Sequence, residues 1–274
     1  MQVREYSLAE GWYPRKPDEI HRFLSDFSAE NGKFRAAVAP HAGWYYCGRL
    51  AASAICRLER DAETIVVLGG HLPAGASPLF AMEDAVRTPL GSMSIDTELR
   101  TVLMEKLVGK SDRFTDNTIE VLLPMVRFFF PGAMLLWLRL PAGIASFAAG
   151  KTIAEAAQKL KRKINVIASA DLTHYGRNFG FTPRGIGEKA LKWVKEANDF
   201  NFIRALEAGN PDEVLKHAEI NKASCSAGAV LGAMGFAEAC ALPKARLLEY
   251  STSADVIGDA APDSFVGYAA LVFG

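Results

Sequence analysis

The sequence predicts an α/β fold: a single domain with a central, mostly parallel sheet flanked by helices. Short apolar runs recur along the chain, and they are continuous rather than alternating, which is typical of strands buried on both faces. Helical patterns separate the early runs, as the crossover connections of parallel strands require. No tract rich in Pro, Gly or Ser divides the 274 residues, so we expect residues 1–274 to form one domain.

The apolar runs give six predicted strands: Phe34–Ala39, Thr64–Gly70, Ala133–Leu140, Ile164–Ala170, Ala245–Ser253 and Ser264–Phe273. Helical patterns occupy residues 48–60, 96–108 and 146–163, with Asp96 as an N-cap of the second, and a longer helical block covers 186–240. The most apolar zone, residues 119–140, is interrupted by two prolines and two arginines. It is therefore predicted to be a buried helix followed by a buried strand, not a membrane span.

The charge balance excludes several partners. Lys plus Arg and Asp plus Glu both number 31, so the chain has no electrostatic footprint for nucleic acid or an anionic membrane.

The N-terminal stretch has no apolar segment of the kind found in secretory signals. Four cysteines without a C-x-x-C spacing indicate free thiols in a reducing, cytoplasmic location. Three of them lie on helical patterns and are predicted core thiols: Cys47, Cys56 and Cys240.

Polar residues follow three predicted strands at the point where each strand ends. His41 stands between Pro40 and Ala42-Gly43, His71 follows two glycines, and Asp171 opens the segment that leads to His174. Loops that leave the carboxyl ends of such strands meet at one edge of the sheet. We therefore expect these side chains to lie close together. The two histidines in polar, helical patterns are predicted to be surface residues: His21 and His217.

Imidazoles that converge from different strands suit zinc, iron, copper or nickel. Two histidines and one anionic ligand would leave positions open on the metal, and the anionic ligand is either Asp171 or the thiolate of Cys225, in NKASCSAGAV. A structural alternative stays open for each residue. A strand-end histidine is often a turn or core residue, and Cys225 could be a small buried residue at a helix start. No dinucleotide fingerprint, phosphate loop or nucleophile elbow is present in the sequence.

The motifs PHAGWYYCG, GGH, NTIEVLLPMVRFFFP, SADLTHYG, CSAGAV and YSTSADVIGD…SFVGYAA occur in the order found in the Memo family. Bacterial and archaeal members of that family are called protein B of the AmmeMemoRadiSam system. The resemblance covers about Arg15 to Leu271. It implies a fold like that of the class III extradiol ring-cleaving dioxygenases, which hold non-haem Fe(II).

The same resemblance implies a ligand set. The matching metal-site positions are His41, His71 and Cys225, with Asp171 and His174 lining the same pocket. Cys225 thereby becomes the preferred third ligand, at the place that a carboxylate fills in the dioxygenases. Fe(II) is the expected metal, with copper or zinc as alternatives.

Two departures from the family pattern alter the surroundings of the ligands. The chain has Asp116-Asn117-Thr118 where the family usually has Glu-His-Ser, and Cys225-Ser226 where it usually has Cys-Gly.

The resemblance implies an oxygen-dependent redox enzyme that acts on a small organic molecule such as a phenol. His174 is the expected general acid or base, and Asp171 is expected to orient an imidazole or tune the metal. Trp44 and Tyr45 are candidate substrate-binding aromatics, with core packing as their alternative. A second hypothesis is a metal- or peptide-binding adaptor without turnover, and a third is a zinc-dependent hydrolase. Association with AMMECR-type and radical-SAM proteins follows from the name of the system.

Overall fold

A computed structural model describes residues 2–27, 32–114 and 116–274 of the protein. Nine of the described strands form one sheet. Its centre consists of four parallel strands in the order β2 (Ala36–Ala39), β9 (Ile164–Ser169), β3 (Thr64–Leu72) and β8 (Met134–Pro141). These strands are buried almost throughout, as their continuous apolar sequences predict, and the α/β class is confirmed.

Both flanks of the sheet contain antiparallel pairs, so the sheet is mixed. On one side β12 (Ser264–Phe273) runs antiparallel to β2, to β10 (His174–Gly176) and to β11 (Ala245–Thr252). On the other side β4 (Leu79–Phe80) runs antiparallel to β8 and parallel to β7 (Lys110–Ser111). β11 and β12 are joined through the short helix α11 (Ser253–Ile257), without the long crossover that a parallel pair needs.

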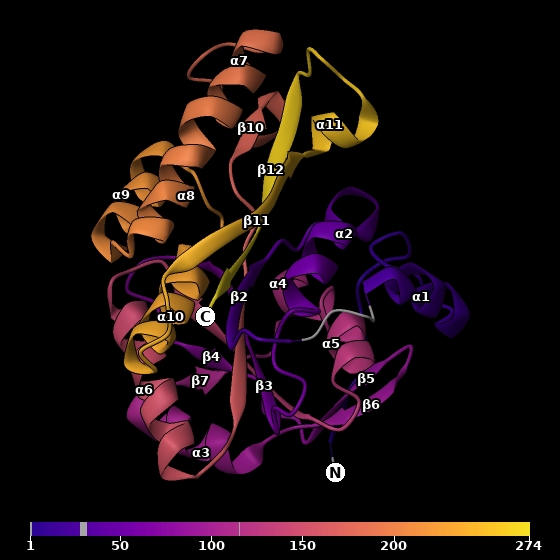
Figure 1. Ribbon diagram of the computed structural model, residues 1–274, viewed down its shortest axis with the longest axis vertical. Helices are drawn as coiled ribbons and strands as arrows, with labels where there is room; N and C mark the ends of the chain where they lie inside the picture. The colour runs from indigo at the N-terminus through magenta and orange to yellow at the C-terminus, as the bar shows by residue number, and fades with distance from the viewer. Residues whose placement is uncertain (1, 28–31, 115) are drawn as a thin grey trace.

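Helices cover both faces of the central strands (Figure 1). α6 (Ala145–Lys159) and α10 (Ala227–Ala239) lie together on one face, and α2 (Trp44–Ile55) lies on the other with α5 (Leu123–Phe129). The predicted helix N-cap at Asp96 is confirmed, because its carboxylate accepts a hydrogen bond from the backbone of Leu99 at the start of α3 (Thr97–Lys106).

The predicted helical block is divided into α7 (Glu188–Trp193), a π-helical turn (Val194–Asn198), α8 (Asp199–Ala208), α9 (Pro211–Asn221) and α10. The other described helices are α1 (Pro17–Leu24) and α4 (Asn117–Glu120), with 3-10 turns at Ser25–Phe27 and Arg177–Phe179. A small separate sheet contains β1 (Val3–Arg4), β5 (Ala85–Thr88) and β6 (Gly91–Ser94). Strands of two to four residues are too short to show a period in the sequence.

Most of the cysteines and histidines outside the predicted metal site lie where the sequence predicts them. Cys47 and Cys56 are buried, but Cys240 is only partly buried because it ends α10 near the surface. His21 is exposed. His217 is half-buried rather than a surface residue, because α9 turns it toward Asn221, whose amide nitrogen lies 3.1 Å from its Nδ1. Among the described helices, none is both long and apolar enough to cross a membrane.

Candidate metal centre

The carboxyl end of β3 is built around two glycines that let other elements touch the strand. A side chain at position 69 would collide with Thr118 of α4, and one at position 70 would collide with Ser226 at the start of α10. Successive strand residues point to opposite faces, so the two glycines admit a neighbour on each face. Gly69 and Gly70 therefore bring α4 and the Cys225 turn against the strand that carries His71.

The sequence predicts His71 just beyond a strand that ends at Gly70. In the structure β3 continues to Leu72, so His71 lies inside the strand. The pairing with β8 shifts register between Gly69 and Leu72, so His71 occupies a bulge. Its φ is +58°, in the left-handed region that residues other than glycine seldom adopt. A bulge redirects a side chain that would otherwise follow the strand alternation. The imidazole of His71 thereby faces that of His41, with ring centroids 5.2 Å apart.

His41 lies on the loop that follows β2 and is buried, with a side chain 1 % exposed. Its backbone nitrogen donates to Asp171 Oδ1 at 2.7 Å, and its Nδ1 lies 3.0 Å from the Ser169 hydroxyl. These contacts leave Nε2 directed at the Cys225 thiol, at 3.3 Å. The ring is held from two sides and has little rotational freedom.

Cys225 lies in the turn between α9 and α10. Its backbone nitrogen donates to the Asp171 carbonyl at 3.2 Å, and the Ser224 hydroxyl donates to the same oxygen at 3.3 Å. Asp171 therefore holds both His41, through its carboxylate, and Cys225, through its carbonyl. This residue joins two of the three metal-ligand candidates.

His41, His71 and Cys225 each present one ligand atom, and these three atoms all lie within 4.8 Å of one another. In a tetrahedral site with bonds of about 2.0–2.3 Å, ligand atoms are roughly 3.3–3.8 Å apart. Two imidazole nitrogens and a thiolate suit zinc, iron or copper. The residues present fit a single transition-metal ion.

The charges of the cluster also fit a cation. Burial raises the pKa of the Cys225 thiol, but His41 and His71 outweigh burial and lower the pKa to about 5. Burial lowers the pKa of His41, but Asp171 and Cys225 outweigh it and raise the pKa to about 9. Hydrogen bonds to Asp116 and Cys225 raise the pKa of His71 to about 10. A metal that binds here would displace the imidazole protons and meet a thiolate.

Two residues that the sequence singled out only as family departures hold the ligands. Asp116 Oδ2 lies 3.3 Å from His71 Nδ1, and Asn117 donates its amide to the His41 carbonyl at 3.3 Å. Asp116 also caps the start of α4, and its contact with His71 depends on the bulge in β3, which the sequence pattern did not indicate.

A cavity of about 390 Å³ opens beside the cluster. His41, His71, Asp171 and His174 all line it, so the structure brings these four predicted residues together. His174 Nδ1 lies 3.2 Å from the Leu172 carbonyl oxygen. The aromatic side chains in the lining come from four places in the chain: Trp12, Tyr46, Phe179 and Tyr268.

Trp44 and Tyr45 do not line this cavity. Trp44 begins α2 and is buried, and its indole nitrogen donates to the Val121 carbonyl at 2.9 Å. Tyr45 is 70 % exposed, and it lines a different surface hollow together with Trp44. The next residue, Tyr46, reaches the cavity instead. The sequence prediction started the helix at residue 48 and so gave no helical phase for these aromatics.

Comparisons with known proteins match nearly the whole length of the chain. A family model described as Memo-like protein matches residues 4–272. A MEMO1 family protein of Methanopyrus kandleri is 30% identical over 296 residues, covering 98% of each chain, and one of Pyrococcus furiosus is 30% identical over 290 residues with the same coverage. The crystal structure of an uncharacterized protein from Escherichia coli shares the fold, with a TM-score of 0.50, 14% identity, and coverage of 88% of this chain and 100% of that one.

Proposed function

Because the chain belongs to the Memo family, we propose that it is a metal-dependent enzyme that oxidises a small organic molecule with O₂. In this proposal His41, His71 and Cys225 bind one divalent metal ion. Iron in the reduced state is the proposed metal, with copper or zinc as the alternatives. The observation that carries the proposal is the convergence of two imidazoles and a thiol beside an open cavity.

When bound, the metal would supply Lewis acidity and, as iron, one-electron chemistry with O₂. Three protein ligands leave at least one coordination position for an exchangeable ligand, which is typical of catalytic rather than structural sites. Asp171 would keep two of the ligands in place through its carboxylate and its carbonyl oxygen. We therefore assign Asp171 a role in holding the ligand set.

His174 is the proposed acid or base. Its Nδ1 is within hydrogen-bond distance of the Leu172 carbonyl, which can only accept, so the neutral ring carries its proton on Nδ1. In that tautomer Nε2 is the nitrogen that can accept a proton, and the ring lines the cavity. This tautomer suits removal of a proton from a substrate hydroxyl group, followed by its return.

The size and the aromatic lining of the cavity favour a small, planar substrate. A volume of about 390 Å³ is within the usual size of small-molecule sites, and tyrosine, phenylalanine and tryptophan rings in its lining can pack against an aromatic ring. Cys225 is a free cysteine, and it must stay reduced in order to bind the metal as a thiolate. We therefore propose a reducing compartment, the cytoplasm, as the location of the protein. Association with AMMECR-type and radical-SAM proteins stays a prediction.

The test begins with anaerobic purification, iron loading and metal analysis of the wild type, His41→Ala and Cys225→Ser. The wild type should hold one iron per chain, and both variants should lose stoichiometric binding because each removes a ligand. Cys240→Ser is the matched control, since Cys240 ends α10 and is no member of the cluster. It should bind iron like the wild type.

The loaded wild type is then screened for O₂ consumption against catechols and related phenols. Consumption that depends on both iron and a phenol would support the enzyme. Stoichiometric iron without consumption for any compound would favour the adaptor hypothesis. A His41→Ala protein that keeps one iron with unchanged affinity would contradict the ligand assignment.

A further inference from the structure

The carboxylate of Asp116 is held by three groups at once. Its Oδ2 lies 3.3 Å from His71 Nδ1 and 3.0 Å from Arg139 Nη1. Its Oδ1 accepts from the backbone nitrogen of Thr118 at 2.9 Å and from the Thr118 hydroxyl. The Asp116 side chain is 11 % exposed, so these contacts are sheltered from water.

A buried ion pair supports this carboxylate from behind. Arg139 donates through Nε and Nη2 to the two oxygens of Asp112, at 2.9 and 3.2 Å, and these side chains are 6 % and 1 % exposed. Paired, planar contacts of this kind have one favoured geometry. Arg139 therefore presents its third nitrogen to Asp116 from a fixed position.

His71 needs such an anchor more than His41 does. Its side chain is 35 % exposed, against 1 % for His41, and comes from a bulge in β3, so neighbouring atoms restrain its ring less. A contact between Nδ1 and a carboxylate selects both the ring orientation and the tautomer, and it leaves Nε2 for a metal. It also makes Nε2 a stronger donor to that metal.

We propose that Asp116, held by Arg139 and Thr118, is the positioning residue that orients His71 toward the metal centre. This inference rests on the proposed metal site. Asp116 itself is not a ligand: the cluster that can hold a metal consists of His41, His71 and Cys225. Loss of such a carboxylate typically weakens metal binding by about 10- to 100-fold while the ligands remain.

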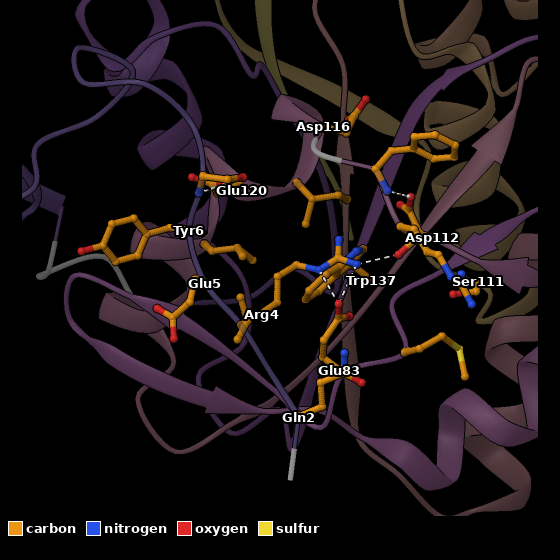
Figure 2. Close-up of a pocket in the computed structure, with 17 residues that line it drawn as sticks. Gln2, Arg4, Glu5, Tyr6, Glu83, Ser111, Asp112, Asp116, Glu120 and Trp137 are labelled. Carbon is orange, nitrogen blue, oxygen red and sulfur yellow. Dashed lines mark hydrogen bonds and ion pairs between the residues drawn. The ribbon is translucent and has the colours of Figure 1, made fainter.

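Asp116 also lines a second cavity, of about 660 Å³, which does not include His71 in its lining (Figure 2). Arg4 crosses this cavity, pairs with Glu83 at 2.9 Å, and lies over the ring of Trp137. Arg4 contacts Glu83 through Oε1, whereas the buried Oε2 of Glu83 has no hydrogen-bond partner. Because Asp116 lines this cavity, the space that a shortened residue 116 would leave adjoins it, and we expect a small anion to enter from there.

Cobalt(II) is the probe for the test, because its binding can be measured by competition with a chelator and a bound thiolate adds near-ultraviolet absorption. Asp116→Asn should bind Co²⁺ about 10- to 100-fold more weakly than the wild type. Asp116→Gly should bind still more weakly and should regain affinity in added formate, which can replace the carboxylate through the second cavity. Glu83→Gln, also a carboxylate-to-amide change in that cavity, should bind Co²⁺ like the wild type.

Melting temperatures of the metal-free proteins separate positioning from simple stability. Weak binding by Asp116→Asn with a nearly unchanged melting temperature, and recovery of Asp116→Gly by formate, would support the inference. Wild-type affinity in Asp116→Asn would overturn it. A loss of affinity that only parallels a loss of stability, without formate recovery, would also overturn it. A wild type that binds no Co²⁺ and no Fe²⁺ would instead remove the proposed metal site, and the inference with it.

Discussion

The Nε2 atom of His41 lies 3.3 Å from the Cys225 thiol, although 184 residues separate the two in the chain. Asp171 makes this possible, because its carboxylate binds the backbone of His41 and its carbonyl binds that of Cys225. The pair therefore depends on a loop that contributes no ligand atom of its own to the cluster. We expect substitutions of the ligands to remove metal binding, and substitution of the cavity residue His174 to remove proton transfer while the metal stays bound.

Replacing His174 with alanine should leave metal binding intact and remove nearly all turnover. His174 lines the cavity but is absent from the cluster of ligand atoms, so its loss removes an acid or base and not a ligand. Loss of a general acid or base costs about 10²–10⁴-fold in rate. Iron content and O₂ consumption, measured on the same preparation with a phenol from the screen, check this.

His217→Ala is the control for that variant, because His217 lies on α9 and is no member of the cluster. It should keep both iron and turnover. If His174→Ala instead lost its iron, His174 would be a ligand and Cys225 the residue to doubt. Normal iron and turnover with a lower melting temperature would show that His174 is only structural.

Gly70→Ala should damage the metal site through the backbone. A methyl group there would collide with the side chain and Cα of Ser226, the residue after Cys225. Forcing an extra carbon into a packed interior typically costs about 1–3 kcal/mol. We expect a lower free energy of unfolding in urea and weaker Co²⁺ binding, because β3 and the Cys225 turn must move apart.

Gly132→Ala provides the comparison, since a methyl group at position 132 meets nothing within 4 Å. This variant should unfold and bind Co²⁺ almost as the wild type does. Equal behaviour of the two alanine variants would show that the close approach at Gly70 is not needed for the site.

Asp199 should give the protein a pH-dependent loss of stability. This carboxyl is fully buried on α8 and accepts from Thr173 and from the Tyr250 hydroxyl, the latter at 2.7 Å. Burial outweighs these hydrogen bonds and raises its pKa from 3.8 to about 6. The folded state then binds the proton more tightly than the unfolded state does.

The stabilisation from this proton is fully present below pH 4 and is lost as the pH rises through about 6. A shift of about two units corresponds to about 3 kcal/mol. Asp199→Asn cannot titrate, so the wild type should lose stability relative to this variant between pH 4 and pH 7. Urea unfolding of both proteins across that range measures the difference. A constant difference would show that Asp199 has an ordinary pKa.

The sequence predicted the long strands well because their burial on both faces leaves unbroken apolar runs. β3, β8, β9 and β12 begin within one residue of their predicted starts. The antiparallel flanks could not be predicted in the same way, since buried strands look alike whatever their direction. Strands as short as β4 carry too few residues for any period.

The ligand set shows a similar limit. The positions of His41 and His71 near strand ends indicated that they would meet, but Cys225 was preferred over Asp171 only through the family resemblance. The partner of His71, Asp116, was missed because its contact depends on a register shift inside β3. A bulge of this kind has no period that a sequence pattern reveals.

The pairing of β2 has a consequence for how the protein folds. Val38, three residues before His41, pairs with Ala168 on one side and with Leu271 on the other. Contacts between segments so distant in sequence form slowly, because long loops must close before any pairing energy is gained. The strand leading into His41 is thus completed only when the far end of the described chain has docked. Metal loading should therefore follow folding, and a growing chain on the ribosome would expose its histidines before the cavity that protects them exists.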